Sequence, residues 1–360
     1  MARQSPLSDL HRSHGANFQQ VDGWELPERY QDPVLEHRAV RDSVGLLDLA
    51  PRALIRVTGT ERTRFLNGML TNDISKLEEG QGCYACLLTP QGKIVTDLDV
   101  YALNDWHLLE LDARWKERAL DYLNKYLIAD DVTFHDLEDY ALLALQGPRA
   151  MAVLGRLLPC ASLPAVEQSC IEVTLDDQLC QIMNASITGE DGFKLSIPQK
   201  GAATVWQGLQ EAGAIPVGLT ALNTLRLEAG IPWYSVDFDD TNFPQEAGIE
   251  DKAVRFDKGC YVGQEFVIRI AHRGHVNRRV SGFTMQRELV PRSGERVLRD
   301  DKEVGQVTSA AHTPTLGKTI ALGMLRREVQ EPGTVVHVES HGDLIPAEVT
   351  PLPFYRRADG

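Results

Sequence analysis

Several features that would assign a chain of 360 residues to a specialised class are missing from this sequence. No run approaches the roughly 20 apolar residues that a membrane-spanning helix requires. The N-terminus, Met-Ala-Arg-Gln-Ser-Pro-Leu-Ser-Asp-Leu, lacks the apolar core of a secretion signal. The net charge of −14 leaves the chain without the basic excess that binds nucleic acids. We therefore expect a cytoplasmic protein that binds neither membranes nor nucleic acid.

Cysteine is scarce, with six thiols at positions 83, 86, 160, 170, 180 and 260. Cys83 and Cys86 form a C-x-x-C pair, which suggests a metal site or a dithiol. A structural zinc site needs a second such pair, and the sequence has none. The pair also lies in an apolar stretch, residues 83–88, that is typical of a buried strand. We favour the buried strand, assign no metal, and expect free thiols in a reducing cytoplasm.

What the chain does contain is an ordinary globular composition, with 43% hydrophobic and 24% charged residues. Its length suggests two or three domains. Apolar periodicity predicts helices and strands in mixed order. Helices are expected at 34–40, 115–127, 148–158, 202–212 and 220–229, and strands at 53–57, 94–101, 107–111, 141–145, 171–175 and 179–183. Because the two kinds of element do not alternate strictly, the pattern predicts an α+β fold.

The residue pattern of the sequence changes after residue 278. Short β-rich pieces alternate there with turns that contain glycine and proline, and no long helix fits. Such a pattern is typical of a closed or layered all-β domain. We expect a separate β-barrel or sandwich at the C-terminus.

One stretch, Lys258–Glu265, concentrates reactive side chains in the order Lys-Gly-Cys-Tyr-Val-Gly-Gln-Glu, and we call it the signature segment. Before it, residues 235–251 carry six carboxylates and no basic residue. After it, residues 266–287 carry five arginines, two histidines and no acidic residue. The signature segment therefore lies at a charge boundary, and we expect it to line a functional cleft.

Cys260 is the most reactive group that the signature segment offers. Basic neighbours such as Lys258 favour the thiolate, which is the nucleophilic and metal-binding form of cysteine. The alternative is a buried thiol in a tight loop. Lys258, Gln264 and Glu265 either position a ligand or partner in the cleft or form local turn contacts and ion pairs.

The signature segment resembles the motif of the YgfZ-type folate-binding proteins, a branch of the superfamily of the glycine-cleavage T-protein, an aminomethyltransferase. The resemblance extends over nearly the whole chain. Segments similar to the N-terminal part of T-proteins are His14–Ala16, Gly23–Pro27, Glu36–Arg41, Leu70–Asp73, Thr188–Phe193 and Leu225–Gly230. Segments similar to their C-terminal barrel are Gly305–Ser309 and Thr313–Gly317.

The resemblance implies a three-domain, ring-like α+β fold around a central cavity for tetrahydrofolate or a one-carbon-substituted folate. Residues 1–50 and 140–275 would form the central folate-binding domain. Residues 51–139 would form an inserted α+β domain, and residues 276–356 the C-terminal β-barrel. We expect the protein to act as a monomer.

The resemblance also implies roles for individual residues. Asp97 would be the catalytic or folate-orienting carboxylate, Glu190 and Arg226 would contact the pterin, and Tyr234 matches a tyrosine near the same site. Carboxylates accept hydrogen bonds from ring N–H groups, and the arginine fork donates to carbonyls or carboxylates. From the residues alone, Asp97 and Asp99 would form a solvated strand face, Glu190 a surface turn, and Arg226 a helix-surface cation.

The remaining candidates lie in and after the signature segment. The resemblance includes Lys258, Gly259, Tyr261, Gly263, Gln264 and Glu265 in the motif, with Cys260 as its reactive thiol. The arginines 269, 273, 278 and 279 are candidates to hold the glutamate tail of a folate or a phosphate-bearing partner. Charge runs are more often solvated faces, so both interpretations stay open.

Two departures separate this chain from T-proteins. T-proteins carry a Gly-Gly turn followed by paired aspartates, whereas this chain has Gly92-Lys93 and Thr96-Asp97. T-proteins also lack a cysteine at the position of Cys260. Both departures argue against the T-protein reaction, in which the folate N5 captures a methylene from an aminomethylated lipoyl arm and ammonia is released.

From the sequence we therefore expect a tetrahydrofolate-binding protein of the YgfZ type that supports iron–sulfur cluster assembly or repair through Cys260. Its partners would be iron–sulfur client or assembly proteins. The alternative is an aminomethyltransferase or a related folate-dependent one-carbon transferase. A third possibility is a regulatory folate binder without chemistry, so whether the protein is an enzyme stays open.

Overall fold

The computed structural model describes residues 2–159, 162–175 and 177–357. These residues divide into two compact units, which are described one by one. The first contains residues 1–67, 73–84 and 98–222, and the second contains residues 68–72, 85–97 and 223–360. The three-domain division expected from the sequence stays a prediction. Cys160 lies outside the described residues.

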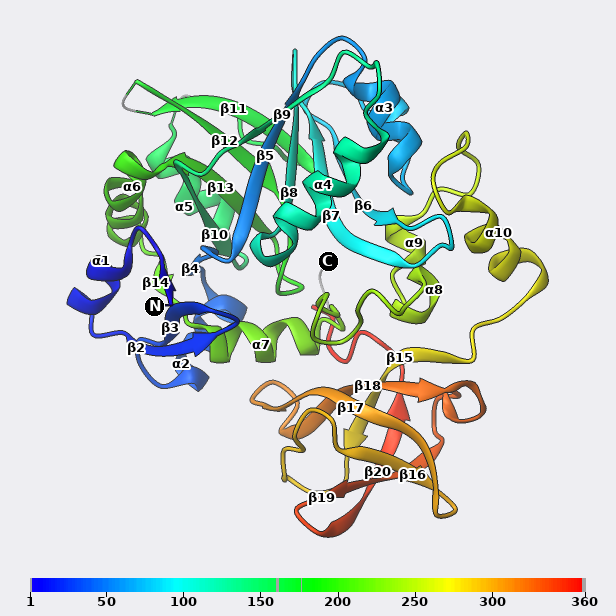
Figure 1. The fold of residues 1–360 in the computed structure, drawn as a ribbon. Helices are drawn as coiled ribbons and strands as arrows, with labels where there is room; N and C mark the ends of the chain where they lie inside the picture. The colour runs from blue at the N-terminus through cyan, green and yellow to red at the C-terminus, as the bar shows by residue number, and fades with distance from the viewer. Residues whose placement is uncertain (1, 160–161, 176, 358–360) are drawn as a thin grey trace. The chain divides into compact units, whose positions relative to one another are not determined.

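A six-stranded sheet forms the centre of the first unit, in the order β11-β12-β13-β10-β4-β14 (Figure 1). All of its pairs are antiparallel except that of β14 with β4. Its strands are β4 (Gly45–Asp48), β10 (Tyr140–Gln146), β11 (Ser169–Leu175), β12 (Gln178–Asn184), β13 (Gly192–Pro198) and β14 (Ile215–Pro216).

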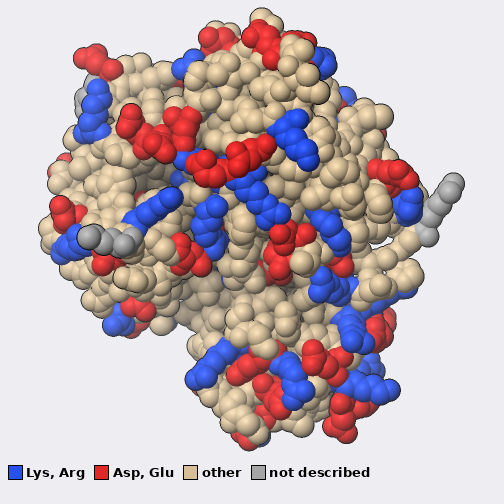
Figure 2. All heavy atoms as spheres, viewed as in Figure 1, with Lys and Arg blue, Asp and Glu red and all other residues tan. Residues whose placement is uncertain are grey.

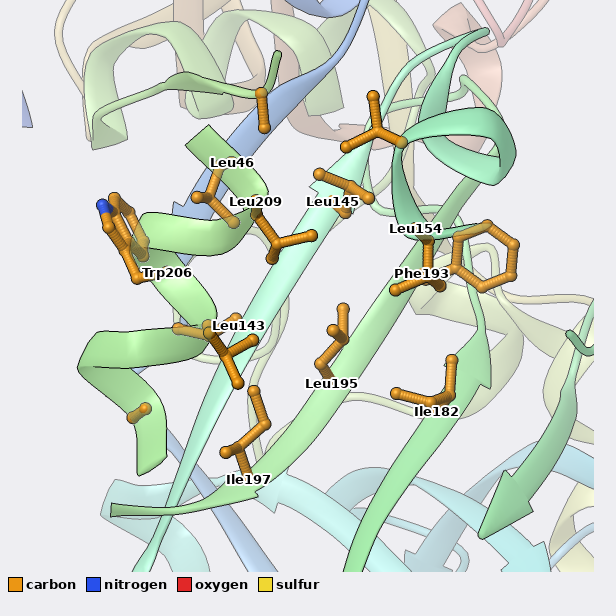
Figure 3. Close-up of a cluster of buried hydrophobic side chains, with 14 of the residues drawn as sticks. Leu46, Leu143, Leu145, Leu154, Ile182, Phe193, Leu195, Ile197, Trp206 and Leu209 are labelled. Carbon is orange, nitrogen blue, oxygen red and sulfur yellow. The ribbon is translucent and has the colours of Figure 1, made fainter. Parts of the chain in front are cut away.

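The main core of the first unit lies between this sheet and two helices, α5 (Ala150–Leu157) and α6 (Gln199–Glu211). Figure 3 shows Trp206 and Leu209 of α6 packed near Leu143 of β10 and Leu195 of β13. Both strands are buried along most of their length, which explains their nearly continuous apolar sequences. Burial of this apolar surface is the main force that holds the sheet and helices together.

A small sheet and a helix near the N-terminus also belong to the first unit. A three-stranded sheet has the order β1-β3-β2, formed by β1 (Arg3–Gln4), β2 (Asn17–Val21) and β3 (Trp24–Arg29), with α1 (Ser8–Ser13) nearby in sequence. Helix α2 (Pro33–Asp42) begins after Asp32, whose carboxylate accepts a hydrogen bond from the Val34 N–H group. Proline at the first helical position and an aspartate cap are strong helix-start signals.

A five-stranded sheet has the order β6-β7-β8-β5-β9. Its strands are β5 (Arg52–Thr58), β6 (Gly82–Leu88), β7 (Ile94–Ala102), β8 (His107–Asp112) and β9 (Thr133–Asp136). The helices of this region are α3 (Arg62–Met69) and α4 (Lys116–Tyr126), with short 3₁₀ turns at Ile74–Lys76 and Ala113–Trp115. Strands β7 and β8, both predicted as strands, pair antiparallel.

Helix α7 spans Leu219–Glu228, and residues 223–228 of it belong to the second unit, which contains three further helices among the described residues. These are α8 (Pro244–Ala247), α9 (Glu250–Ala253) and α10 (Gln264–Arg273). The sequence did not predict α10, because its arginines and histidine made the stretch resemble a charge run. Yet Val267 on this helix is fully buried, so α10 packs on the second unit through its apolar side.

The second unit ends in a closed antiparallel barrel of the order β15-β18-β17-β16-β19-β20, drawn in yellow to red in Figure 1. Its strands are β15 (Arg278–Met285), β16 (Arg296–Arg299), β17 (Lys302–Thr313), β18 (Lys318–Arg326), β19 (Val335–Ser340) and β20 (Asp343–Thr350). A 3₁₀ turn spans Arg327–Val329. Inward apolar side chains from all six strands fill the barrel. The predicted α+β class and C-terminal barrel are confirmed.

No helix within residues 2–159, 162–175 and 177–357 is long and apolar enough to span a bilayer.

Candidate functional site

The signature segment is anchored through its first lysine. Lys258 is only 8% exposed, and its Nζ donates to the carbonyl oxygens of Leu70, at 2.7 Å, and Asn72, at 2.6 Å. The backbone N–H of Val262 donates to the carbonyl oxygen of Gly68 at 3.1 Å. Three hydrogen bonds thus fix the signature segment on residues 68–72. Lys258 is therefore part of the structural support of Cys260.

A second anchor of the signature segment is Gly263, which has a φ of 84°. A Cβ atom at this position would lie 2.5 Å from the carbonyl oxygen of Thr89 and 3.1 Å from the Cα of Gly92. Glycine alone allows both the left-handed conformation and this close approach. The signature segment is thereby packed against the turn between β6 and β7.

The next two residues of interest, Cys260 and Tyr261, differ in their exposure. Cys260 is exposed, so the alternative interpretation of a buried thiol is wrong. Tyr261 is only 7% exposed, and its hydroxyl finds no hydrogen-bond partner among the described residues. Gln264 and Glu265, which follow, open α10, and the exposed Glu265 pairs with Arg269 one helical turn later. The segment thus presents a thiol to solvent and buries a phenol.

Asp97 is half-buried on β7, near Cys86 of β6. Burial, and then the negative charge of Asp97, raises the pKa of the Cys86 thiol well above its ordinary value. Asp99, two residues later, is buried and accepts a hydrogen bond from Lys194 at 2.9 Å. Asp97 and Asp99 therefore do not form the solvated strand face that the residues alone suggested.

Arg226 is buried, at 1% exposure, although the residues alone suggested a helix-surface cation. It forms an ion pair with Asp237 and donates to Ser309 Oγ at 2.6 Å, and its guanidinium lies 4.6 Å from the centre of the Trp233 ring. Asp237 in turn accepts a hydrogen bond from the backbone N–H of Trp233 at 2.9 Å. Within the second unit, Arg226 thus joins α7 to the loop after it and to β17.

The same loop carries Tyr234, which is buried. Its hydroxyl donates to the carbonyl oxygen of Val95 at 2.8 Å, and its ring packs edge-on against Phe238. Val95 precedes Asp97 by two residues on β7, so this bond fixes Tyr234 beside the strand that carries Asp97. The structure therefore brings Asp97 and Tyr234 into one neighbourhood of the second unit.

Glu190 belongs to the first unit, where the turn that carries it is buried rather than on the surface. At 3% exposure, it accepts a hydrogen bond from Arg41 Nη1 at 2.8 Å. The same nitrogen donates to the carbonyl oxygen of Thr188 at 3.1 Å. Gln146 holds the turn as well, because its Oε1 accepts from the Ile187 N–H group at 2.9 Å. Glu190 is thus an oriented, buried carboxylate.

Two ion pairs within the second unit join the acidic and basic sides of the charge boundary seen in the sequence. Arg278 lies 3.5 Å from Glu246, and Arg279 lies 2.9 Å from Glu250. Basic residues after the signature segment therefore pair with acidic residues before it. The face drawn in Figure 2 likewise shows lysines and arginines beside aspartates and glutamates. Anion binding by Arg269 and Arg278 stays a prediction, and the side chain of Arg273 lies outside the described part.

One group beside the signature segment was missed at the sequence level. Lys93, on the β6–β7 turn, places its Nζ 3.3 Å from the centre of the Phe243 ring and 3.5 Å from Glu246. Burial lowers the pKa of Lys93, and the charge of Glu246 partly opposes the shift. The signal was present, since Lys93 replaces the second glycine of the T-protein turn. In the part of the chain that the structure describes, no group of three metal-binding side chains gathers.

Comparison with known proteins gives consistent matches along the chain. The GCVT N-terminal domain family matches residues 7–258, and the glycine cleavage T-protein C-terminal barrel domain family matches residues 278–356. The aminomethyltransferase of Bacillus subtilis is 32% identical over 99% of this chain and 100% of its own length. That of Rubrobacter xylanophilus is 34% identical over 99% of this chain and 95% of its own.

A solved structure agrees in fold over the same length. The crystal structure of glycine cleavage system aminomethyltransferase T from Bartonella henselae matches with a TM-score of 0.93 at 28% identity. The match covers 99% of this chain and 98% of that one.

Proposed function

Since the chain belongs to the glycine-cleavage T-protein family, we propose that it binds tetrahydrofolate and acts as an aminomethyltransferase or a related folate-dependent one-carbon transferase. The observation that carries this proposal is the match to named aminomethyltransferases over essentially the full length of both chains. This similarity supports the transferase more strongly than the iron–sulfur role that the sequence motif placed first.

The chemistry of the candidate residues fits a reduced folate. A pterin ring presents N–H donors and a carbonyl acceptor, and ionised carboxylates accept such N–H groups. Glu190 meets this need as a buried carboxylate that Arg41 holds in place. Asp97 offers a second carboxylate, half-buried on β7. When bound, tetrahydrofolate would supply the nitrogen that accepts the one-carbon unit.

In this proposal each residue has a separate task. Glu190 binds the ring, and Asp97 accepts a proton or a hydrogen bond at its carboxylate oxygens next to the reacting group. Tyr234 forms part of the wall beside Asp97. Arg226 acts as a positioning residue, because its ion pair with Asp237 fixes the loop that carries Tyr234. A guanidinium with these internal partners supports the site rather than reaching the ligand.

An assay with tetrahydrofolate and an aminomethylated lipoyl-protein donor tests the transferase. We expect the protein to release ammonia, and Asp97→Asn to lower the rate by about 100-fold or more, the usual contribution of a general acid or base. Asp105→Asn, at an exposed aspartate of the first unit, is the control and should leave the rate unchanged. Absence of ammonia release by a protein that binds tetrahydrofolate would refute the transferase step.

The exposure of Cys260 favours a second candidate function, the support of iron–sulfur enzymes in the manner of YgfZ-type proteins. An accessible thiol can act as a nucleophile, a redox group or a transient ligand. Cys260→Ala separates the two functions, because the transferase needs no thiol at this position. If the transferase is the whole function, the variant keeps ammonia release and supports iron–sulfur enzymes in cells as the parent does. Loss of iron–sulfur enzyme activity alone supports the second function.

A further inference from the structure

The buried hydroxyl of Tyr261 has no role in the fold that the structure explains. The side chain is 7% exposed, and its oxygen finds no partner in the described part of the chain. A hydroxyl that loses water without gaining a hydrogen bond lowers the stability of the folded state. Most buried polar groups have a partner, and one that has none calls for an explanation such as a catalytic role or a bound water or ion.

The ring of Tyr261 lies beside the anchored Lys258, and the backbone that carries it is fixed on both sides. On one side, Nζ of Lys258 lies 5.1 Å from the ring centre, and two carbonyl oxygens fix that nitrogen. On the chain itself, Val262 is bonded to Gly68, and Gly263 lies against the β6–β7 turn. The backbone on both sides of Tyr261 is therefore anchored, and its orientation is a fixed property of the signature segment.

The segment that carries Tyr261 lies near the strand that carries Asp97, because Gly263 packs against the β6–β7 turn and Asp97 lies on β7. Burial and then Cys86 raise the pKa of Tyr261, and burial and then Asp97 raise the pKa of Cys86. All three residues lie in the second unit. Tyr261 therefore stays protonated at every physiological pH and can serve as a hydrogen-bond donor in the neighbourhood of Asp97.

We propose that the Tyr261 hydroxyl donates a hydrogen bond to an acceptor atom of the bound folate, beside Asp97. This inference rests on the proposed folate function and adds one ligand-binding residue to it. Asp97 supplies an acceptor and Tyr261 supplies a donor, so the two recognise opposite polarities on the same end of the ligand. Cys86, which is buried and has a raised pKa, stays a neutral thiol.

Titration of tetrahydrofolate into the parent protein and into Tyr261→Phe tests the inference. Phenylalanine keeps the ring and removes only the oxygen. We expect binding to weaken about five- to tenfold, as for loss of one neutral hydrogen bond. The midpoint temperature of thermal unfolding of the ligand-free variant should be unchanged or slightly higher than that of the parent. The reason is that the substitution removes a buried oxygen with no hydrogen-bond partner among the described residues.

Tyr101→Phe is the matched control. Its hydroxyl is likewise buried and without a partner among the described residues, but its ring packs against Gly82, where a Cβ would lie 2.4 Å from it. This variant should bind tetrahydrofolate as the parent does. If Tyr261→Phe binds tetrahydrofolate as tightly as the parent, or if Tyr261→Phe and Tyr101→Phe lose affinity equally, the role of Tyr261 is wrong. Either result leaves the proposed folate function standing. Failure of the parent to bind tetrahydrofolate would overturn the proposed function as well.

Discussion

Two buried lysines, one in each unit, carry the same charge but have different structural roles. Lys194 in the first unit donates to carboxylates, to Asp99 at 2.9 Å and to Glu110 at 2.6 Å. Lys258 in the second unit donates to two backbone carbonyls of residues 68–72. The first lysine completes an ion-pair network between strands. The second fixes the path of a loop.

The difference in hydrogen-bond partners shows that a buried lysine can either pair with carboxylates in a core or hold a loop in place. Arg52 joins the Lys194 network by donating to Glu110 at 2.7 Å, so opposite charges meet inside the protein. Burial alone lowers the pKa of Lys194, but Asp99 and Glu110 outweigh it and hold the pKa above its ordinary value. Around Lys258, by contrast, the anchored segment leaves the Cys260 thiol exposed, and the Tyr261 hydroxyl has no hydrogen-bond partner among the described residues. The charges of the first arrangement are paired inside the protein, whereas we propose that the groups of the second contact a ligand.

The largest effect is expected from Lys194→Met. The change leaves the carboxylates of Asp99 and Glu110 buried without their shared cation, and breaking such a pair costs about 3–5 kcal/mol. Urea denaturation measures the loss in free energy of unfolding. Lys200→Met, at an exposed lysine that follows on the same chain segment, should stay within about 0.5 kcal/mol of the parent. Equal losses in the free energy of unfolding of the two variants would contradict the proposed contribution of the Lys194 network.

The stability gap between the parent and Lys194→Met should depend on pH at both ends. Burial raises the pKa of Glu110, but Lys194 and Arg52 outweigh it and the net shift is downward. This contribution is present above the ordinary glutamate pKa and is lost as pH falls through the lowered value. The Lys194 contribution is lost as pH rises through its raised value. The gap should therefore be widest between about pH 5 and pH 10, and denaturation at pH 4 and 7 that shows a wider gap at pH 4 would contradict it.

Next in size is Gly263→Ala in the signature segment. The variant forces a left-handed conformation on alanine and drives its Cβ to 2.5 Å from the Thr89 oxygen, so we expect a loss of about 2–4 kcal/mol. Gly259→Ala is the control, because a Cβ there meets nothing within 4 Å. Thermal unfolding of both variants tests the contrast. Similar melting temperatures would show that the close approach to the β6–β7 turn does not occur.

The smallest effect on stability is expected from Lys258→Met, at about 1–3 kcal/mol for the loss of charge-assisted hydrogen bonds to two carbonyls. Because the anchor of the signature segment is lost, tetrahydrofolate binding should weaken in the same variant. Lys194→Met should unfold more easily and, where folded, bind as the parent does. The comparison would be refuted if Lys194→Met lost tetrahydrofolate binding while Lys258→Met kept it and lost more stability.

The sequence predicted much of the fold because its signals are local. Strands β7 and β8 and the barrel follow from apolar alternation and turn residues, and the structure has them. Helix α10 was missed because it begins after Gly263, whose left-handed φ only the structure shows, and because its basic residues dominate the pattern. Burial of Glu190 and Arg226 was also missed. Their partners, Arg41 and Asp237, are identified only once the chain has folded.

The site residues divide in the same way. Resemblance pointed to Asp97, Tyr234 and Cys260, whereas the contacts of Lys93 and the buried hydroxyl of Tyr261 are seen only in the structure. Sequence patterns report which groups are present. They do not report which of those groups have found a partner.

Isothermal titration of tetrahydrofolate into the purified protein tests the central claim most directly. We predict saturable binding at one site per chain, weakened at least tenfold by Asp97→Asn and unchanged by Asp105→Asn. Mass analysis of any folate that co-purifies would identify its one-carbon substituent. A folded protein that releases no heat with tetrahydrofolate and retains no folate would contradict the account.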